Sequence, residues 1–249
     1  MAKFEQRRDL SATETENMWV SYYDSLEGDD NKATFKAEYE RYTKIHSWDN
    51  AVRVILEKAQ IRDGQSVLDA GCGWGRMLIG VVAERTNLTV EAIDISAPAI
   101  EIGKDLLGEH RNGNRITWRE GNLESLPFDD GTFDAMYSSR VFQHVDNPAR
   151  AVSEVMRVLK PGGTFAIFLQ NKLNPLNLSY YSNLFSPGQV RQWFGTGKLP
   201  SELRVDSMDF FPNALGFVPK GLRLGMERTL ESVPGLNKLG GKVLAYGRK

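Results

Sequence analysis

The sequence contains almost no cysteine. Cys72 is the only one among 249 residues, so no disulfide can form within the chain and a cysteine-rich zinc site is excluded. An excess of one charge sign is also missing, because 31 basic and 32 acidic residues leave a formal net charge of −1. A dedicated nucleic-acid-binding protein would carry a basic excess. We therefore expect a reducing compartment and no nucleic-acid partner.

Long apolar runs are absent as well. No run approaches the roughly 20 residues that a membrane-spanning helix needs, and the first residues lack the apolar core of a signal peptide. We expect no membrane anchor and a cytoplasmic location. What the chain does contain is an ordinary globular mixture, 41% hydrophobic and 25% charged, which can bury a core. Its length suits one elaborated α/β domain.

From Ser66 onward, short β-branched and apolar runs alternate with longer segments of helical period. This pattern builds a parallel sheet with crossover helices. The strands are expected at 66–70, 89–93, 116–120, 133–138, 164–170, 203–208 and 242–247. The helices are clearest at 75–85, 97–107 and 148–159, and a further helix begins at Ser186-Pro187.

The two ends of the chain differ from this middle part. Residues 1–60 are polar and rich in aromatic residues at helical spacing, which predicts an N-terminal helical cap or lid. Residues 61–249 are expected to form the core domain. Within it, the segments 171–200 and 210–241 are too long for simple connections, so we interpret them as insertions on the substrate side.

A glycine-rich segment, Asp69-Ala-Gly-Cys-Gly-Trp-Gly75, follows the first predicted strand and precedes a predicted helix. Glycines in this position let a ligand approach the backbone closely. The spacing is G-x-G-x-G, and Arg76 stands where a nicotinamide-binding fingerprint has its third glycine. Because an ordinary tight turn can have the same composition, this segment alone is a weak signal.

Polar residues follow the next two strands. Asp94 ends the second strand, where a carboxylate can accept hydrogen bonds from two ribose hydroxyls. The alternative is a role in starting a helix, since Ser96 and Pro98 mark a helix start there. After the third strand, Asn122 is a candidate for hydrogen bonds to an adenine edge, and Leu123 for packing on a ring face.

Taken together, these segments resemble the class I S-adenosylmethionine-dependent methyltransferases. The nearest branch acts on small molecules and includes ubiquinone/menaquinone-biosynthesis-type enzymes. The resemblance covers about residues 60–170, in the family's order and spacing. The segments that carry it are Val67-Leu-Asp-Ala-Gly-Cys-Gly-Trp-Gly75, Ile93-Asp-Ile-Ser96, Gly121-Asn-Leu-Glu-Ser-Leu-Pro-Phe128, Phe133-Asp-Ala-Met-Tyr-Ser-Ser139, His144-Val145 and Arg157-Val-Leu-Lys-Pro-Gly-Gly163.

The resemblance implies a doubly wound α/β fold of Rossmann-like type, with a mostly parallel seven-stranded sheet whose last strand is antiparallel. It also implies S-adenosylmethionine as the cofactor and S-adenosylhomocysteine as the product. Asn122 departs from the family, which more often has Asp there; Asn keeps an acceptor oxygen but loses the charge. The implied cofactor-binding residues are Asp69, Gly71, Cys72, Gly73, Asp94, Ile95, Asn122, Leu123 and Ser138.

The implied reaction transfers a methyl group to an oxygen or nitrogen of a small molecule, and this chemistry requires no metal. His144 follows the fourth strand and is a candidate general base, although a packed histidine that supports the loop is the alternative reading. Tyr22, Tyr23, Arg41 and His46 are candidate lid contacts. Docking of the aromatic helices on the sheet would explain most of these rings equally well.

Several alternatives remain open from the sequence. A nicotinamide-dependent reductase is disfavoured by Arg76. A non-catalytic cofactor-binding sensor or partner subunit, and a protein methyltransferase, are compatible with the same motifs. DNA adenine methylation is disfavoured, because Ser138-Ser-Arg-Val141 stands where such enzymes carry an Asn-Pro-Pro-Tyr type of tetrad. We expect a monomer or a homodimer.

Overall fold

The computed structural model describes residues 46–174, 184–195, 200–208 and 239–249, together with residues 226, 229 and 233. The predicted N-terminal cap lies outside these ranges except for its end, the helix α3 (His46–Lys58). The two predicted insertions, 171–200 and 210–241, are described only in part. The division of the chain into cap, core and insertions therefore stays a prediction.

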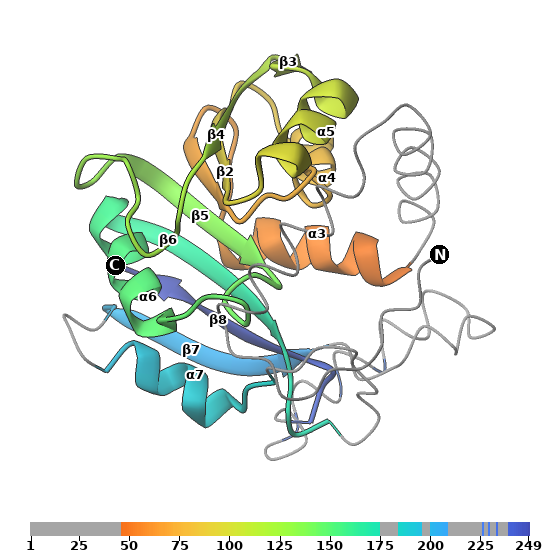
Figure 1. Cartoon of the computed structure of the whole chain (residues 1–249). Coiled ribbons are helices and arrows are strands. Elements are labelled where there is room, and N and C mark those ends of the chain that lie inside the picture. The colour runs from red at the N-terminus through yellow and green to blue at the C-terminus, as the bar shows by residue number, and fades with distance from the viewer. Residues whose placement is uncertain are drawn as a thin grey trace.

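Within the described part of the chain, one sheet of eight strands has the order β3-β4-β2-β1-β5-β6-β8-β7 (Figure 1). All seven predicted strands are present. The strands are β1 (Ser66–Ala70), β2 (Thr89–Asp94), β3 (His110–Arg111), β4 (Asn114–Glu120), β5 (Phe133–Ser139), β6 (Leu159–Gln170), β7 (Glu202–Met208) and β8 (Lys242–Arg248).

The pairing confirms a mostly parallel, doubly wound sheet. The strands β4, β2, β1, β5 and β6 are parallel neighbours, whereas β8 pairs antiparallel with both β6 and β7. From β1 the chain proceeds outward through β2 to β4, and it then returns to β5 on the other side of β1. This reversal makes the carboxyl ends of β1 and β5 the place where such sheets bind ligands.

The extra strand β3 forms a hairpin with β4, in which Arg111 pairs with Asn114. Its two turn residues, Asn112 and Gly113, have φ of 53° and 75°. Positive φ at both central residues defines the turn that Asn-Gly favours between antiparallel strands. The dipeptide Asn112-Gly113 therefore indicates this hairpin in the sequence, although the hairpin was not predicted.

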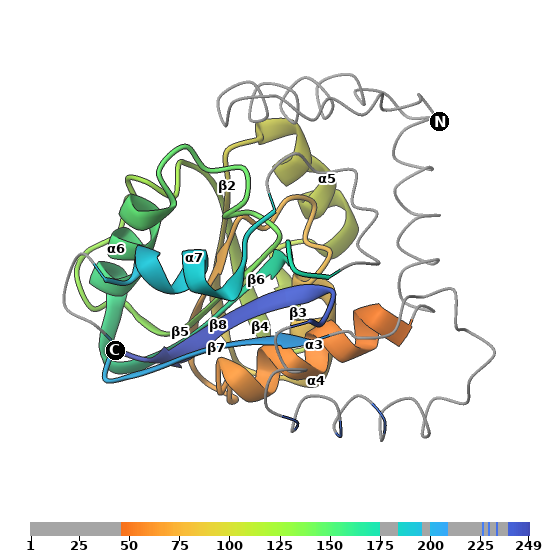
Figure 2. The same cartoon turned by 90° about the horizontal axis from the view of Figure 1, so that it is seen from below.

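Helices cover both faces of the sheet (Figure 2). One core cluster joins α3, α4 (Leu78–Glu84) and α5 (Ala97–Leu107) to one face, and the other joins α6 (Pro148–Val158) and α7 (Pro187–Trp193) to the opposite face. The strands serve both clusters because their side chains alternate. Val67 of β1, for example, lies in the first cluster and the adjacent Leu68 in the second.

The helix boundaries follow ordinary capping chemistry. Asn147 accepts a hydrogen bond from the backbone N–H of Arg150 and starts α6, as predicted. Helix α4 begins only at Leu78, three residues later than expected, because Gly73 and Gly75 have positive φ and keep the glycine-rich segment out of the helix. That segment therefore forms a longer loop between β1 and α4 than the sequence suggested.

Candidate cofactor-binding and active site

The loop after β1 is held against β2 by backbone hydrogen bonds. The N–H groups of Gly71 and Cys72 both donate to the carbonyl oxygen of Ile93, at 2.8 and 3.0 Å. Gly71 has φ +82°, and a Cβ at this position would collide with the side chain of Val141. Two separate reasons therefore require glycine at position 71: its positive φ, and the close approach of the chain that follows β5.

The last glycine of this loop has a different reason. Gly75 has φ +80°, and an added Cβ would lie 2.9 Å from the indole of Trp118. The same indole, on β4, also lies where a Cβ on Gly103 of α5 would be. Its Nε1 donates to the carbonyl oxygen of Gly108 at 3.1 Å. We call this arrangement of Gly75, Gly103 and Trp118 the indole slot, and it packs the loop against β4 and α5.

Asp94 at the end of β2 faces the glycine loop. Its two carboxylate oxygens accept hydrogen bonds from the backbone N–H groups of Gly73 (2.7 Å) and Ser96 (3.0 Å). Burial raises the pKa of Asp94, and these backbone donors oppose that rise. Ser96, not Asp94, caps α5, since its hydroxyl accepts from Ala99 N–H. Each carboxylate oxygen can accept a further bond from a ligand.

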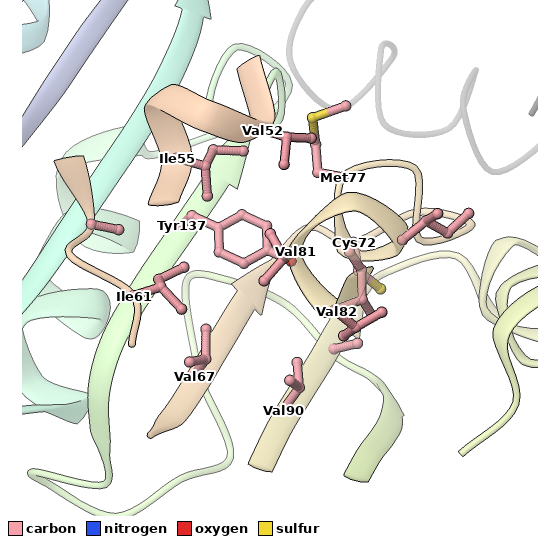
Figure 3. Close-up of a cluster of buried hydrophobic side chains, with 14 of the residues drawn as sticks. Val52, Ile55, Ile61, Val67, Cys72, Met77, Val81, Val82, Val90 and Tyr137 are labelled. Atoms are coloured by element: carbon pink, nitrogen blue, oxygen red, sulfur yellow. The ribbon is translucent and has the colours of Figure 1, made fainter. Parts of the chain in front are cut away.

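Asp69 lies at the end of β1 but is buried beneath the loop. The Tyr137 hydroxyl on β5 donates to its carboxylate at 2.7 Å. Burial raises the pKa of Asp69 to about 7, a rise that the hydrogen bond from Tyr137 and the charge of Arg76 reduce and that of Asp94 strengthens. The Tyr137 ring itself lies among core side chains that include Ile55 and Val81 (Figure 3).

A single cavity brings most of the predicted residues together. Asp69 and Ser138 do not line it. Ser138 is fully buried, on the same face of β5 as Met136, whereas the next residue, Ser139, reaches the cavity. The predicted residues that line the cavity are Gly71, Cys72, Gly73, Asp94, Ile95, Asn122, Leu123 and His144.

The loop after β4 forms another wall of this cavity. The side-chain oxygen of Asn122 accepts from the N–H of Glu124 at 2.7 Å, so its amide NH₂ is the group left to donate to a ligand. Leu123 is buried, Ile95 is exposed although it is apolar, and both line the cavity. Two aliphatic side chains therefore face the space beside Asp94, which suits the two faces of a flat aromatic ring.

His144 lines the cavity from the loop after β5. Burial, and to a lesser extent the positive charge of Arg140, lower its pKa to about 4. The ring is consequently neutral at pH 7 and can accept a proton. Cys72 has the opposite character, because burial raises the pKa of its thiol well above the usual value. A thiolate nucleophile is therefore disfavoured at Cys72.

Some residues that line the cavity were not predicted from the sequence, and some predicted residues lie outside the described part of the chain. Trp74, Arg140 and Val141 line the cavity without having been predicted. The only signal for Arg140 and Val141 was their position directly after the fourth predicted strand. The candidate lid residues Tyr22, Tyr23 and Arg41 lie outside the described residues, and of His46 only its backbone at the start of α3 is described.

Comparison with known proteins agrees with this geometry. The family model described as a methyltransferase domain matches residues 68–167. The demethylmenaquinone methyltransferase of Symbiobacterium thermophilum is 33% identical over 119 residues, which cover 47% of this chain and 47% of that protein. The ubiquinone/menaquinone biosynthesis C-methyltransferase UbiE of Zymomonas mobilis is 30% identical over 169 residues, covering 66% of each.

The solved structure of the cyclase SpnF has a TM-score of 0.60 at 21% identity, covering 81% of this chain and 80% of that chain, and so shares the fold. The chain spans about half the length, or less, of several curated relatives that it matches. Residues 68–167 therefore match a methyltransferase domain, and the chain resembles the UbiE-type enzymes.

The site fits the cofactor of this class. The glycine loop presents backbone to the cavity, Asp94 keeps acceptor capacity, and Leu123 and Ile95 offer apolar surface. Among the described residues, no cluster of three or more His, Cys, Asp or Glu side chains could hold a metal ion. No helix in the described ranges is long and apolar enough to cross a membrane.

Proposed function

We propose that this chain transfers the methyl group of S-adenosylmethionine to an oxygen or nitrogen atom of a small molecule. The observation that carries the proposal is the shared cavity, in which the glycine loop and Asp94 meet the neutral side chain of His144. Cofactor-binding groups from β1 and β2 therefore face the same space as a proton acceptor that follows β5. This is the arrangement that a two-substrate transfer needs.

Each part of the cavity has a proposed role. Asp94 accepts hydrogen bonds from the two ribose hydroxyls, while Asn122 donates to the adenine between Leu123 and Ile95. Gly71, Cys72 and Gly73 present backbone to the methionine part. Asp69 and Ser138 lie behind the lining residues, so we assign them the support of the loop and of the β5 end.

The cofactor, when bound, would supply a methyl group on a positively charged sulfur. The leaving group is the neutral thioether of S-adenosylhomocysteine, which is a good one. The residues of the chain hold the acceptor in line and exclude water. As the acceptor forms its new bond to the methyl group, its O–H or N–H proton passes to the neutral ring of His144. Because the pKa of His144 is about 4, the proton is easily returned to solvent after the reaction.

Cofactor binding is tested with Asp94→Ala. The variant loses two charge-assisted hydrogen bonds to the ribose, each of about 1.5–3 kcal/mol, so we expect S-adenosylhomocysteine to bind about 100-fold or more weakly in calorimetry. Glu101→Ala serves as the control, because Glu101 is exposed on α5, does not line the cavity and forms an ion pair with Lys104. Unchanged affinity in Asp94→Ala would show that the nucleoside binds elsewhere.

The reaction itself is tested by incubating the protein with methyl-labelled S-adenosylmethionine and a small-molecule extract. We expect label in a small product, and its attachment to oxygen or nitrogen follows from mass spectrometry. Label on carbon would refute the proposed acceptor atom while leaving the transfer intact. Tight binding of NAD in place of S-adenosylhomocysteine would refute the proposed cofactor.

A further inference from the structure

Arg140 lines the cavity in an unusual backbone conformation. It directly follows β5 and has φ +64°, which lies in the left-handed region that residues with a side chain rarely adopt. Its N–H donates to the carbonyl oxygen of Phe168 on β6 at 2.8 Å. The next residue, Val141, packs on Gly71 of the glycine loop. The strained position is therefore held from both sides, a feature that often accompanies function.

The guanidinium of Arg140 makes no hydrogen bond or ion pair with any described side chain. Two of the carboxylates that line the same cavity are already engaged by backbone donors. Asp94 accepts from Gly73 and Ser96, and Glu124 accepts from the N–H of Asn147 at 2.8 Å. Among the described residues, the half-buried guanidinium of Arg140 therefore has no ion-pair partner, although the carboxylates of Asp94, Glu124 and Asp146 line the same cavity.

Two arginines line the cavity, and their surroundings differ. The charge of Arg76 acts on Asp69, beneath the glycine loop where the methionine part of the cofactor is proposed to bind. Arg140 lies on the same loop after β5 as His144, the proposed proton acceptor, whose backbone N–H donates to the carbonyl oxygen of Val141 at 2.7 Å, and the charge of Arg140 acts on His144. Arg140 therefore belongs to the part of the cavity where the methyl acceptor is expected, and Arg76 to the cofactor side.

We propose that Arg140 binds a carboxylate on the methyl acceptor, so that the enzyme selects acidic small molecules. A guanidinium can bind a carboxylate through two parallel hydrogen bonds, which fixes orientation as well as affinity. This inference rests on the proposed methyl transfer, and it names the class of substrate for that same site. It makes Arg140 a specificity-determining residue.

The proposal has a consequence for the proton acceptor. A bound carboxylate offsets the charge of Arg140, which at present disfavours the protonated form of His144. His144 then becomes a stronger base only while an acidic acceptor is bound. A neutral compound of the same shape would find a weaker base and no partner for the guanidinium.

The test uses benzoate and the neutral, nearly isosteric benzamide as probes. Each is titrated into the full chain saturated with S-adenosylhomocysteine, and the ring resonances of the histidines are followed by NMR. The chain has 3 histidines, so a His144→Gln spectrum assigns the signal of His144. We expect benzoate to shift that signal saturably and to bind about tenfold or more tightly than benzamide.

Arg140→Gln should remove the preference for benzoate. Arg191→Gln is the matched control, because Arg191 is exposed on α7, does not line the cavity, and should leave the preference intact. Absence of a saturable shift in the wild type, equal affinity for both probes, or a preference that survives in Arg140→Gln would each overturn the proposal.

A second measurement separates the acceptor from the cofactor, which also carries a carboxylate. Arg140→Gln should leave the Kd of S-adenosylhomocysteine unchanged within about twofold. If it weakens S-adenosylhomocysteine but not 5′-methylthioadenosine, which lacks the carboxylate, Arg140 serves the cofactor and the proposal is wrong. Failure of the wild type to bind either nucleoside would instead refute the proposed function, independently of the benzoate result.

Discussion

Asp69 offers a sharp test of the electrostatics beneath the glycine loop. Burial raises its pKa to about 7 in the folded chain, against 3.8 when it is solvated. The folded state therefore binds one more proton than the unfolded state between these two values, and stability falls as the pH rises through that window. The full cost above pH 7 is about 4 kcal/mol, from about 1.36 kcal/mol per pKa unit.

His144 acts in the opposite direction. Its pKa falls from 6.5 to about 4 on folding, so the unfolded state binds the extra proton and stability rises with pH through that range. This contribution amounts to about 3 kcal/mol. The two groups nearly cancel between pH 4 and 6.5. The pH profile of the wild type alone therefore does not isolate Asp69, and the raised pKa of Asp94 contributes to that profile as well.

Asp69→Asn separates the two contributions, since the amide oxygen can still accept the hydrogen bond from Tyr137. We expect the free energy of unfolding of the variant, minus that of the wild type, to rise by about 2 kcal/mol between pH 5 and pH 7 and to level off by pH 8. Any packing cost of the amide shifts this difference equally at every pH. The measurement is urea unfolding in a pH series.

Asp134→Asn is the control, because the pKa of Asp134 is shifted in the opposite direction from that of Asp69. Partial burial raises the pKa of Asp134, but the hydrogen bonds from Lys160 and Ser66 outweigh it and lower the pKa below its usual value. Its stabilisation is present above the unfolded pKa and is lost only in more acidic solution. The difference for Asp134→Asn should therefore be constant from pH 5 to 8. A constant difference for Asp69→Asn as well would refute the raised pKa.

Two further predictions concern the loop and the proposed base. Gly75→Ala should lower the free energy of unfolding by about 2–4 kcal/mol in urea melts, because backbone strain adds to the clash with Trp118. Gly64→Ala, with φ +79° and open space around it, should cost only about 1 kcal/mol; equal costs would contradict the indole slot. His144→Gln should lower kcat about 100-fold or more while S-adenosylhomocysteine affinity stays unchanged, and an equal loss of both would favour packing.

The parts of the fold that depend on local pattern were predictable from the sequence. The strand β1 and the helix α5 have the predicted bounds, because a short apolar run and a helix start at Ser96 are visible in the residues themselves. The order of the motifs identified the methyltransferase class, which the family match confirms. Asp94, Gly71 and Gly73 line one cavity, as expected from neighbouring strand ends.

The remaining features depend on contacts between distant residues. Tyr137 and Asp69 are 68 positions apart, and no local pattern reveals their hydrogen bond. Whether Ser138 or Ser139 reaches the cavity depends on the phase of β5, which an error of one residue inverts. The left-handed conformation of Arg140 accompanies its backbone hydrogen bond to Phe168 of β6 and the packing of the next residue, Val141, on Gly71, and arginine itself gives no sign of it.

The indole slot has a consequence for how this domain changes over evolution. Trp118, Gly75 and Gly103 come from three separate elements but occupy one volume. A larger residue at either glycine requires Trp118 to move or to be replaced by a smaller residue. A smaller residue at position 118 alone leaves a void that destabilises the core. The three positions should therefore vary as a group among relatives. A change in the glycine loop is therefore constrained by α5, a helix whose residues do not line the cavity.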